Sequence, residues 1–160
     1  MVIRIQHVLP LMIAFLGAAA FADDRPETLA IIVNKKSGLD SVSVSELSKI
    51  FKAEKRKDPA GFRFVVIMRE PGSRERSAAL GQIFRMNEDE YSRYFLQAVF
   101  TGAVASAPRQ LNSSAGVKKF VSENPGAIGY VRGGDQDESV KTLRVDGKLP
   151  DEAGYQITMK

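Results

Sequence analysis

Apolar runs along the chain predict a set of strands. Three runs are almost continuously apolar and end in turn-forming residues, which is typical of strands buried on both faces. They cover residues 28–33, 62–68 and 127–131. A fourth segment, residues 140–145, alternates between apolar and polar positions as a half-buried strand does. The tail from Asp146 onward is rich in turn residues and predicts a loop.

Helical spacing of apolar residues marks four further segments, and each has a capping signal at its start. The segments are residues 43–51, 73–84, 87–100 and 112–123, with loops predicted at 52–61 and 101–108. Ser43 or Ser45 caps the first helix. Asn87 and Glu90 form a capping box at the start of the third helix. Strands and helices alternate without a repeat or a linker, which predicts a single α/β domain.

Aromatic side chains form a stripe on the third predicted helix. The stripe consists of Tyr91, Tyr94, Phe95 and Phe100. Such a stripe at helical spacing is typical of a packed core, so we predict that these side chains are buried. Exposure of the stripe would instead indicate a protein partner.

The N-terminus has the features of a secretory signal peptide. Arg4 and His7 form a short positive region, residues 8–21 are largely apolar, and Ala22 completes a small-x-small cleavage pattern. We therefore predict cleavage after Ala22 and a mature domain of residues 23–160 that is periplasmic or secreted, without stable membrane insertion. The alternative is an uncleaved membrane anchor, but the apolar run is shorter than the ~20 residues that a span needs.

Composition restricts the chemistry of the mature domain. The chain has no cysteine, and its one histidine, His7, lies in the predicted signal. Thiol and Ser-His-Asp catalysis and the usual zinc and copper sites are therefore excluded, so we predict a protein that is not an enzyme, with no metal and no cofactor. A hydrolase with two carboxylates is the remaining catalytic alternative, but no spacing of acidic residues indicates a converging pair. The net charge of +4 is spread over mixed acidic and basic residues, so no nucleic acid is predicted as a partner.

The most informative stretch runs from residue 67 to residue 76. An apolar run stops at Arg69, turns through Pro-Gly, and continues as a helix from Ser73. Unpaired amides at a helix start attract oxyanions, so the amides of Gly72, Ser73 and Arg74, with the Ser73 hydroxyl and the Arg69 guanidinium, form a candidate anion site. The alternative is an ordinary capped helix, with Ser73 as its N-cap and with Arg74 and Arg76 solvated.

Two further features extend this candidate site. Ser113 and Ser114 begin another predicted helix, whose amides either face the same ligand or are simply capped. Glu70 lies next to Arg69. As a hydrogen-bond acceptor it would favour monohydrogen phosphate, which carries a proton, over sulfate, which does not. The alternative for Glu70 is a solvated surface charge.

Four separated motifs resemble the phosphate-binding periplasmic proteins of phosphate ABC transporters, in the type II periplasmic binding protein superfamily. They are Ile-Ile-Val-Asn at 31–34, Ser-Glu-Leu-Ser-Lys-Ile-Phe-Lys at 45–52, Val-Val-Ile-Met-Arg-Glu-Pro-Gly-Ser at 65–73 and Asn-Pro-Gly-Ala-Ile-Gly-Tyr-Val at 124–131. Members of that family close two lobes around the anion, and this chain resembles a single lobe. The resemblance implies an α/β lobe with a mixed sheet flanked by helices. Arg69 matches the family's arginine, whereas Pro71-Gly72-Ser73-Arg74 stands where the family reads Ser-Gly-Thr.

These observations give two hypotheses for function. The first is an exported, non-catalytic solute-binding-type protein that holds phosphate or a similar oxyanion. Its cleft would be completed by a second lobe, by self-association or by a transporter subunit. The second is a protein-interaction module of the cell envelope that keeps the lobe fold without binding a ligand.

Overall fold

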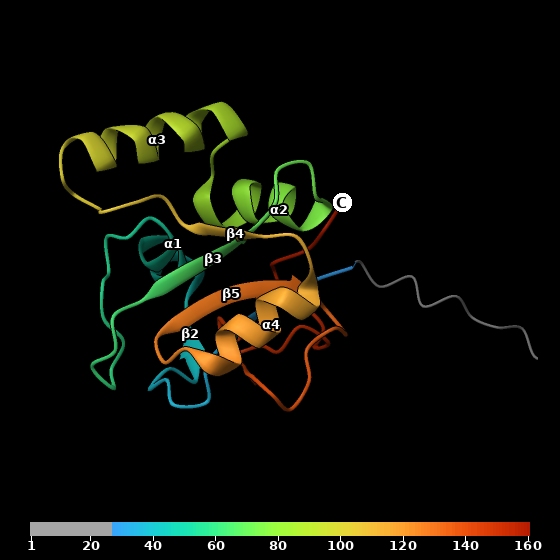
Figure 1. The fold of residues 1–160 in the computed structure, drawn as a ribbon. Helices are drawn as coiled ribbons and strands as arrows, with labels where there is room; N and C mark the ends of the chain where they lie inside the picture. Colours follow the sequence, from blue (N-terminus) through green and yellow to red (C-terminus); the bar gives the residue numbers. More distant parts are fainter. Residues whose placement is uncertain (1–26) are drawn as a thin grey trace, which may run out of the picture.

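A mixed sheet forms the centre of the molecule (Figure 1). The computed structural model describes residues 27–160, so the predicted signal peptide lies outside the described residues. The five-stranded sheet has the order β4-β3-β5-β1-β6. Its strands are β1 (Leu29–Val33), β3 (Val65–Arg69), β4 (Arg109–Leu111), β5 (Ala127–Arg132) and β6 (Lys141–Thr142). A separate two-stranded sheet pairs β2 (Ser41–Val42) with β7 (Arg144–Val145).

Strand direction decides which ends of the strands meet. β3 is parallel to both of its neighbours, β4 and β5, whereas β1 is antiparallel to β5 and β6. Arg69 at the end of β3 therefore lies in register with Leu111 at the end of β4. The helices that follow β3 and β4 consequently begin at the same edge of the sheet.

The helices confirm the predicted capping signals. They are α1 (Val44–Phe51), α2 (Arg74–Ala79), α3 (Glu88–Phe100) and α4 (Ser114–Glu123), and α2 continues as a π-helical turn, η1 (Leu80–Phe84). Ser43 caps α1, and Asn87 forms the predicted capping box with Glu90. None of the helices in residues 27–160 is long and apolar enough to cross a membrane.

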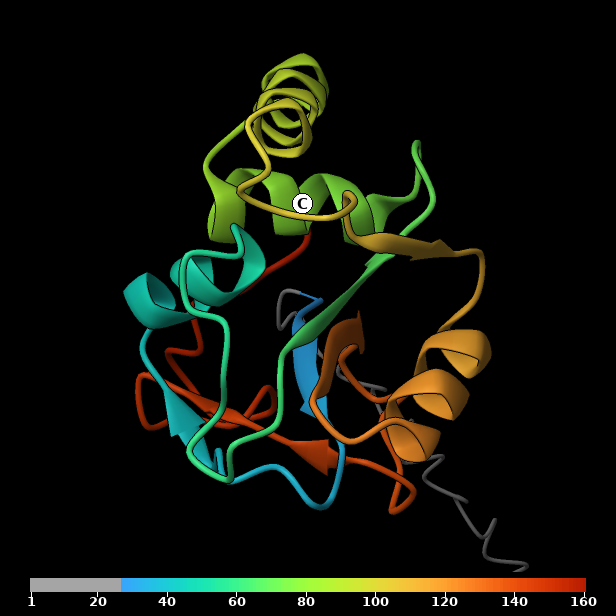
Figure 2. The same cartoon turned by 60° about the vertical axis from the view of Figure 1, so that its left-hand side comes forward.

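Helices cover both faces of the sheet. Figure 2 shows α1 and α4 on opposite sides of the strands, with α3 outside α2. Alternate residues of β1 enter different clusters: Leu29 and Ile31 pack with the helices α1 to α3, and Ala30 and Ile32 pack with α4. Burial on both faces explains why this strand is continuously apolar. The predicted α/β fold, a mixed sheet flanked by helices, is confirmed.

The end of the chain differs from the prediction. Residues 140–145 do not form one strand, because β6 and β7 belong to different sheets and only Leu143 separates them. The tail is irregular as predicted, yet it closes the core. Tyr155, Ile157 and Met159 are buried, and the Tyr155 hydroxyl donates to the carbonyl of Leu29 at 2.7 Å.

Candidate functional site

The candidate site lies at the edge where β3 and β4 end. α2 begins after the turn that follows Arg69, and α4 begins after the short turn that follows Leu111. Tyr130 is buried beside the backbone of Arg69. Its hydroxyl accepts a hydrogen bond from the Arg69 amide at 3.1 Å. Tyr130 is thus a core residue that holds the backbone at the end of β3 in place.

The Arg69 side chain lies between the starts of α2 and α4. Its Nε and Nη2 atoms each donate to a carboxylate oxygen of Glu70 at 3.0 Å. Nη1 lies 3.4 Å from the Ser114 hydroxyl and 3.8 Å from the Glu75 carboxylate. The guanidinium is nearly buried, with 10% of the side chain exposed. These contacts bring Arg69 and Ser114 together, as the anion-site hypothesis requires.

Glu70 is neither free nor simply solvated. Its side chain is 38% exposed, but both carboxylate oxygens accept from Arg69. These hydrogen bonds hold the pKa of the Glu70 carboxyl below its usual value. The carboxylate therefore occupies the fork of donors that a bound oxyanion would use.

Ser73 and Gly72 form the turn into α2. The Ser73 hydroxyl accepts from the Arg76 amide at 3.2 Å and donates to the Glu70 carbonyl at 3.0 Å. This geometry confirms Ser73 as the N-cap. Gly72 has φ +87°, a left-handed conformation that favours glycine.

The two serines of α4 have different positions. The Ser113 hydroxyl caps α4 by accepting from the Gly116 amide at 3.0 Å. Ser114, one residue later, turns its hydroxyl toward Arg69. Only Ser114 of this pair has its side chain at the arginine.

Arg74 is an exposed member of a chain of ion pairs. It pairs with Glu27 at 2.7 Å, and Glu27 also lies 3.6 Å from Arg132 at the end of β5. Arg132 lies 3.6 Å from Glu75, which completes a chain of ion pairs back to Arg69. Arg132 was not predicted as a residue of the site, although Arg132 ends the apolar strand β5 just as Arg69 ends β3.

Arg76 contradicts one part of the ordinary-helix alternative, in which its side chain was solvated. The residue is 2% exposed, and its Nη1 donates to the Arg69 carbonyl at 3.0 Å. Its Nε lies 3.0 Å from both carboxylate oxygens of Glu88, and its guanidinium lies 4.8 Å from the centre of the Tyr91 ring. The buried Arg76 side chain therefore holds the backbone carbonyl of Arg69 in place.

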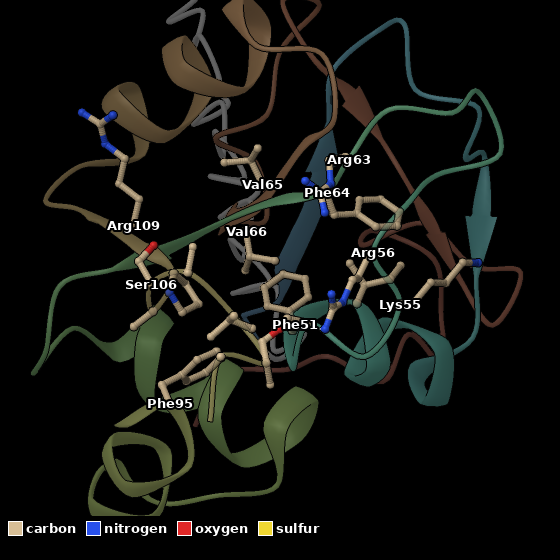
Figure 3. A pocket seen from close by; sticks show the side chains of 18 residues that line it. Phe51, Lys55, Arg56, Arg63, Phe64, Val65, Val66, Phe95, Ser106 and Arg109 are labelled. Carbon is tan, nitrogen blue, oxygen red and sulfur yellow. Dashed lines mark hydrogen bonds between the residues drawn. The ribbon is translucent and has the colours of Figure 1, made fainter. Parts of the chain in front are cut away.

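A separate hollow of about 580 Å³ lies at the other end of β3 (Figure 3). Its walls come from the end of α1, the start of β3 and residues 102–109. Phe51, Phe95 and Val66 line it, and Arg56 donates to the Ala103 carbonyl at 2.7 Å. None of the predicted site residues lines this hollow.

Comparison with known proteins identifies which proteins share this fold. No protein-family model matches the chain. The chain is 27% identical over 124 residues to the phosphate-binding protein PstS of Bacillus subtilis (strain 168). The aligned residues make up 77% of this chain and 37% of that protein. This chain thus spans little more than a third of the length of that relative.

Solved structures agree with this comparison. An ABC-type phosphate transport receptor from Vibrio cholerae matches 78% of this chain and 48% of its own length, with a TM-score of 0.62 and 22% identity. A putative phosphate ABC transporter substrate-binding protein from Clostridium perfringens, solved with bound phosphate, matches 76% of this chain and 46% of its own length, with a TM-score of 0.60 and 22% identity. The chain therefore has the fold of one lobe of the phosphate-binding receptors of ABC transporters, which it also resembles in sequence.

Proposed function

We propose that this chain is an exported, non-catalytic solute-binding-type protein that holds phosphate or a similar oxyanion at the edge formed by β3 and β4. The observation that carries the proposal is the position of the Arg69 guanidinium between the starts of α2 and α4. The resemblance to phosphate-binding relatives supports phosphate as the ligand. Export rests on the predicted signal peptide, with residues 23–160 as the mature domain.

The anion would replace Glu70 on Arg69. A phosphate presents the same kind of paired oxygens as a carboxylate, so it can accept the two hydrogen bonds that Glu70 now accepts. The Ser114 hydroxyl and the amides of Gly72 and Arg74 would supply further donors, whereas the Ser73 amide already donates to the Glu70 carbonyl at 3.4 Å. Hydrogen bonds to charged groups contribute ~1.5–3 kcal/mol each, and less where water competes.

Charge balance predicts a modest affinity for the lone lobe. Within residues 27–160, the ion pairs at this edge join Arg69, Arg74 and Arg132 to Glu27, Glu70 and Glu75. Because the cluster is neutral, an entering anion competes with carboxylates already in place. A second lobe or a transporter subunit that covers the site would exclude water and strengthen each contact.

We expect Glu70→Gln to bind phosphate more tightly than the wild-type chain. Glutamine is uncharged, so it competes less strongly for Arg69, and a partly exposed ion pair of this kind is worth roughly 1 kcal/mol, or about fivefold in affinity. Isothermal titration calorimetry, with protein freed of phosphate by unfolding and refolding, measures the difference.

Glu54→Gln is the matched control, because it removes the same charge from an exposed position outside the cluster. Sulfate titrations report selectivity. If Glu70→Gln weakens phosphate but not sulfate, Glu70 instead accepts the proton of bound phosphate. If neither the wild-type chain nor Glu70→Gln gives heat with millimolar phosphate while both are folded, the proposed function is wrong.

A further inference from the structure

The hollow at the other end of β3 combines apolar and basic side chains. Its volume of about 580 Å³ is in the range of small-molecule sites, which are mostly apolar with a few polar groups that fix the orientation of the ligand. Phe51 of α1, Val66 of β3 and Phe95 of α3 line it (Figure 3). Val65, in its wall, is 39% exposed, although it is a large hydrophobic residue. The hollow therefore presents apolar surface that an apolar molecule can cover.

Phe95 belongs to the aromatic stripe on α3, for which burial was predicted. The prediction is confirmed for Tyr91 and Phe95, and Tyr94 is partly buried against the core. It is wrong for Phe100, which is 91% exposed. Phe95 lines the hollow, whereas Phe100 does not, so the stripe contributes one aromatic side chain to this site.

Every charged side chain that lines the hollow within residues 27–160 is basic. The four are Lys55, Arg56, Arg63 and Arg109. Lys55 is paired with Glu46, and the Arg109 guanidinium lies 4.9 Å from the centre of the Phe120 ring. Two of the four basic side chains are therefore engaged elsewhere in the chain.

The other two, Arg56 and Arg63, keep a positive charge that no carboxylate balances. Arg56 is exposed and donates only to the Ala103 carbonyl, which is uncharged. Arg63 is also exposed, and its side chain makes no hydrogen bond or ion pair within the described part of the chain. Figure 3 shows Arg56 and Arg63 on the same side of the hollow. A molecule with an apolar body and one anionic group is complementary to this arrangement.

We propose that the hollow binds a small apolar carboxylate. The carboxylate pairs with the guanidinium groups of Arg63 and Arg56, whose planar forks of donors match its two oxygens. The apolar body packs against Phe51, Val66 and Phe95. Binding combines the removal of apolar surface from water with charge-assisted hydrogen bonds.

This site is separate from the candidate anion site. Arg63 precedes β3, whereas Arg69 is the last residue of that strand. None of the residues that line the hollow contacts the Arg69 side chain. The inference is therefore independent of the proposed function, and either can fail without the other.

Isothermal titration calorimetry of the protein purified after expression of the full chain tests the proposal. Phenylbutyrate has both an apolar body and a carboxylate, phenylbutyramide has the apolar body without the charge, and acetate has the charge without the apolar body. We expect saturable binding of phenylbutyrate with a Kd of about 1 mM or lower. Phenylbutyramide and acetate should each bind at least about tenfold more weakly, because each lacks one of the two complementary features. Absence of saturable phenylbutyrate binding to the folded protein, or equally tight binding of phenylbutyramide, overturns the proposal.

Variants locate the bound carboxylate. Arg63→Met should weaken phenylbutyrate binding by about tenfold and leave phenylbutyramide unaffected. Arg93→Met is the matched control, because it removes an exposed arginine that does not line the hollow. Phe100→Ser controls for adsorption to the exposed apolar residues of α3 and should leave binding unchanged. Unchanged phenylbutyrate binding in Arg63→Met, or its loss in Phe100→Ser or in folded Arg69→Met, overturns the proposal.

Discussion

Gly126→Ala should destabilise the fold by about 3 kcal/mol, because two separate costs add at this position. Gly126 has φ +86°, where a residue with a Cβ atom is strained. A Cβ atom here would also overlap the carbonyl oxygen of Arg63 and lie 3.1 Å from its carbonyl carbon. That backbone leads into β3, and the Val65 amide donates to the Gly126 carbonyl at 3.0 Å, so neither segment can move away freely.

Urea unfolding of Gly126→Ala beside Gly147→Ala separates the two costs. Gly147 has φ +81° but open space around it, so its substitution should cost only the strain of the left-handed conformation, about 1 kcal/mol. Equal losses in the two variants would show that the close approach of residues 63 and 126 adds nothing.

Arg76→Met should lower the free energy of unfolding by about 2 kcal/mol. Methionine keeps the apolar length of the side chain but removes the hydrogen bond to the Arg69 carbonyl, the ion pair with Glu88 and the contact with the Tyr91 ring. The carboxylate of Glu88 is 44% exposed, so water can solvate it after the substitution, which limits the loss.

Arg93→Met is the control for Arg76→Met. Arg93 is exposed on α3 and its Nε makes only a long contact of 3.4 Å to the Asp89 carbonyl, so its substitution should be nearly neutral. Chemical denaturation of both variants gives the comparison. If the two variants unfold at the same denaturant concentration, the buried contacts of Arg76 do not stabilise the fold.

Local signals explain what the sequence could predict. Ser43, Ser73, Asn87 and Ser113 were readable as caps because a cap depends on residues within the same turn. The strand β1 was readable because burial on both faces leaves a continuous apolar run. In both cases the sequence signal and the structural cause lie in the same few residues.

Contacts between distant segments could not be predicted in the same way. The burial of Arg76 depends on Glu88, which lies on the next helix, and on a carbonyl at the end of β3. The strand β4 has only three residues, and two of them are exposed, so it leaves no apolar run to detect. Yet its parallel pairing with β3 is what places Ser114 beside Arg69.

The pairing of Arg69 with Glu70 changes how the site is understood. Both residues were visible in the sequence, but their adjacency did not reveal that the carboxylate occupies the donor fork. The structure thus holds Arg69 in an ion pair with Glu70. Under the proposed function, affinity depends on how strongly the incoming oxyanion outcompetes Glu70.

If Arg69 contacts the anion, phosphate titration of Arg69→Met should show a loss of binding. The comparison is Arg63→Met, which removes a basic side chain from the hollow at the other end of β3. Both variants are first checked for cooperative unfolding, because Arg69 is buried. We expect calorimetry to detect no saturable phosphate binding to Arg69→Met and unchanged binding to Arg63→Met. Binding that survives in Arg69→Met and is lost in Arg63→Met would contradict this expectation.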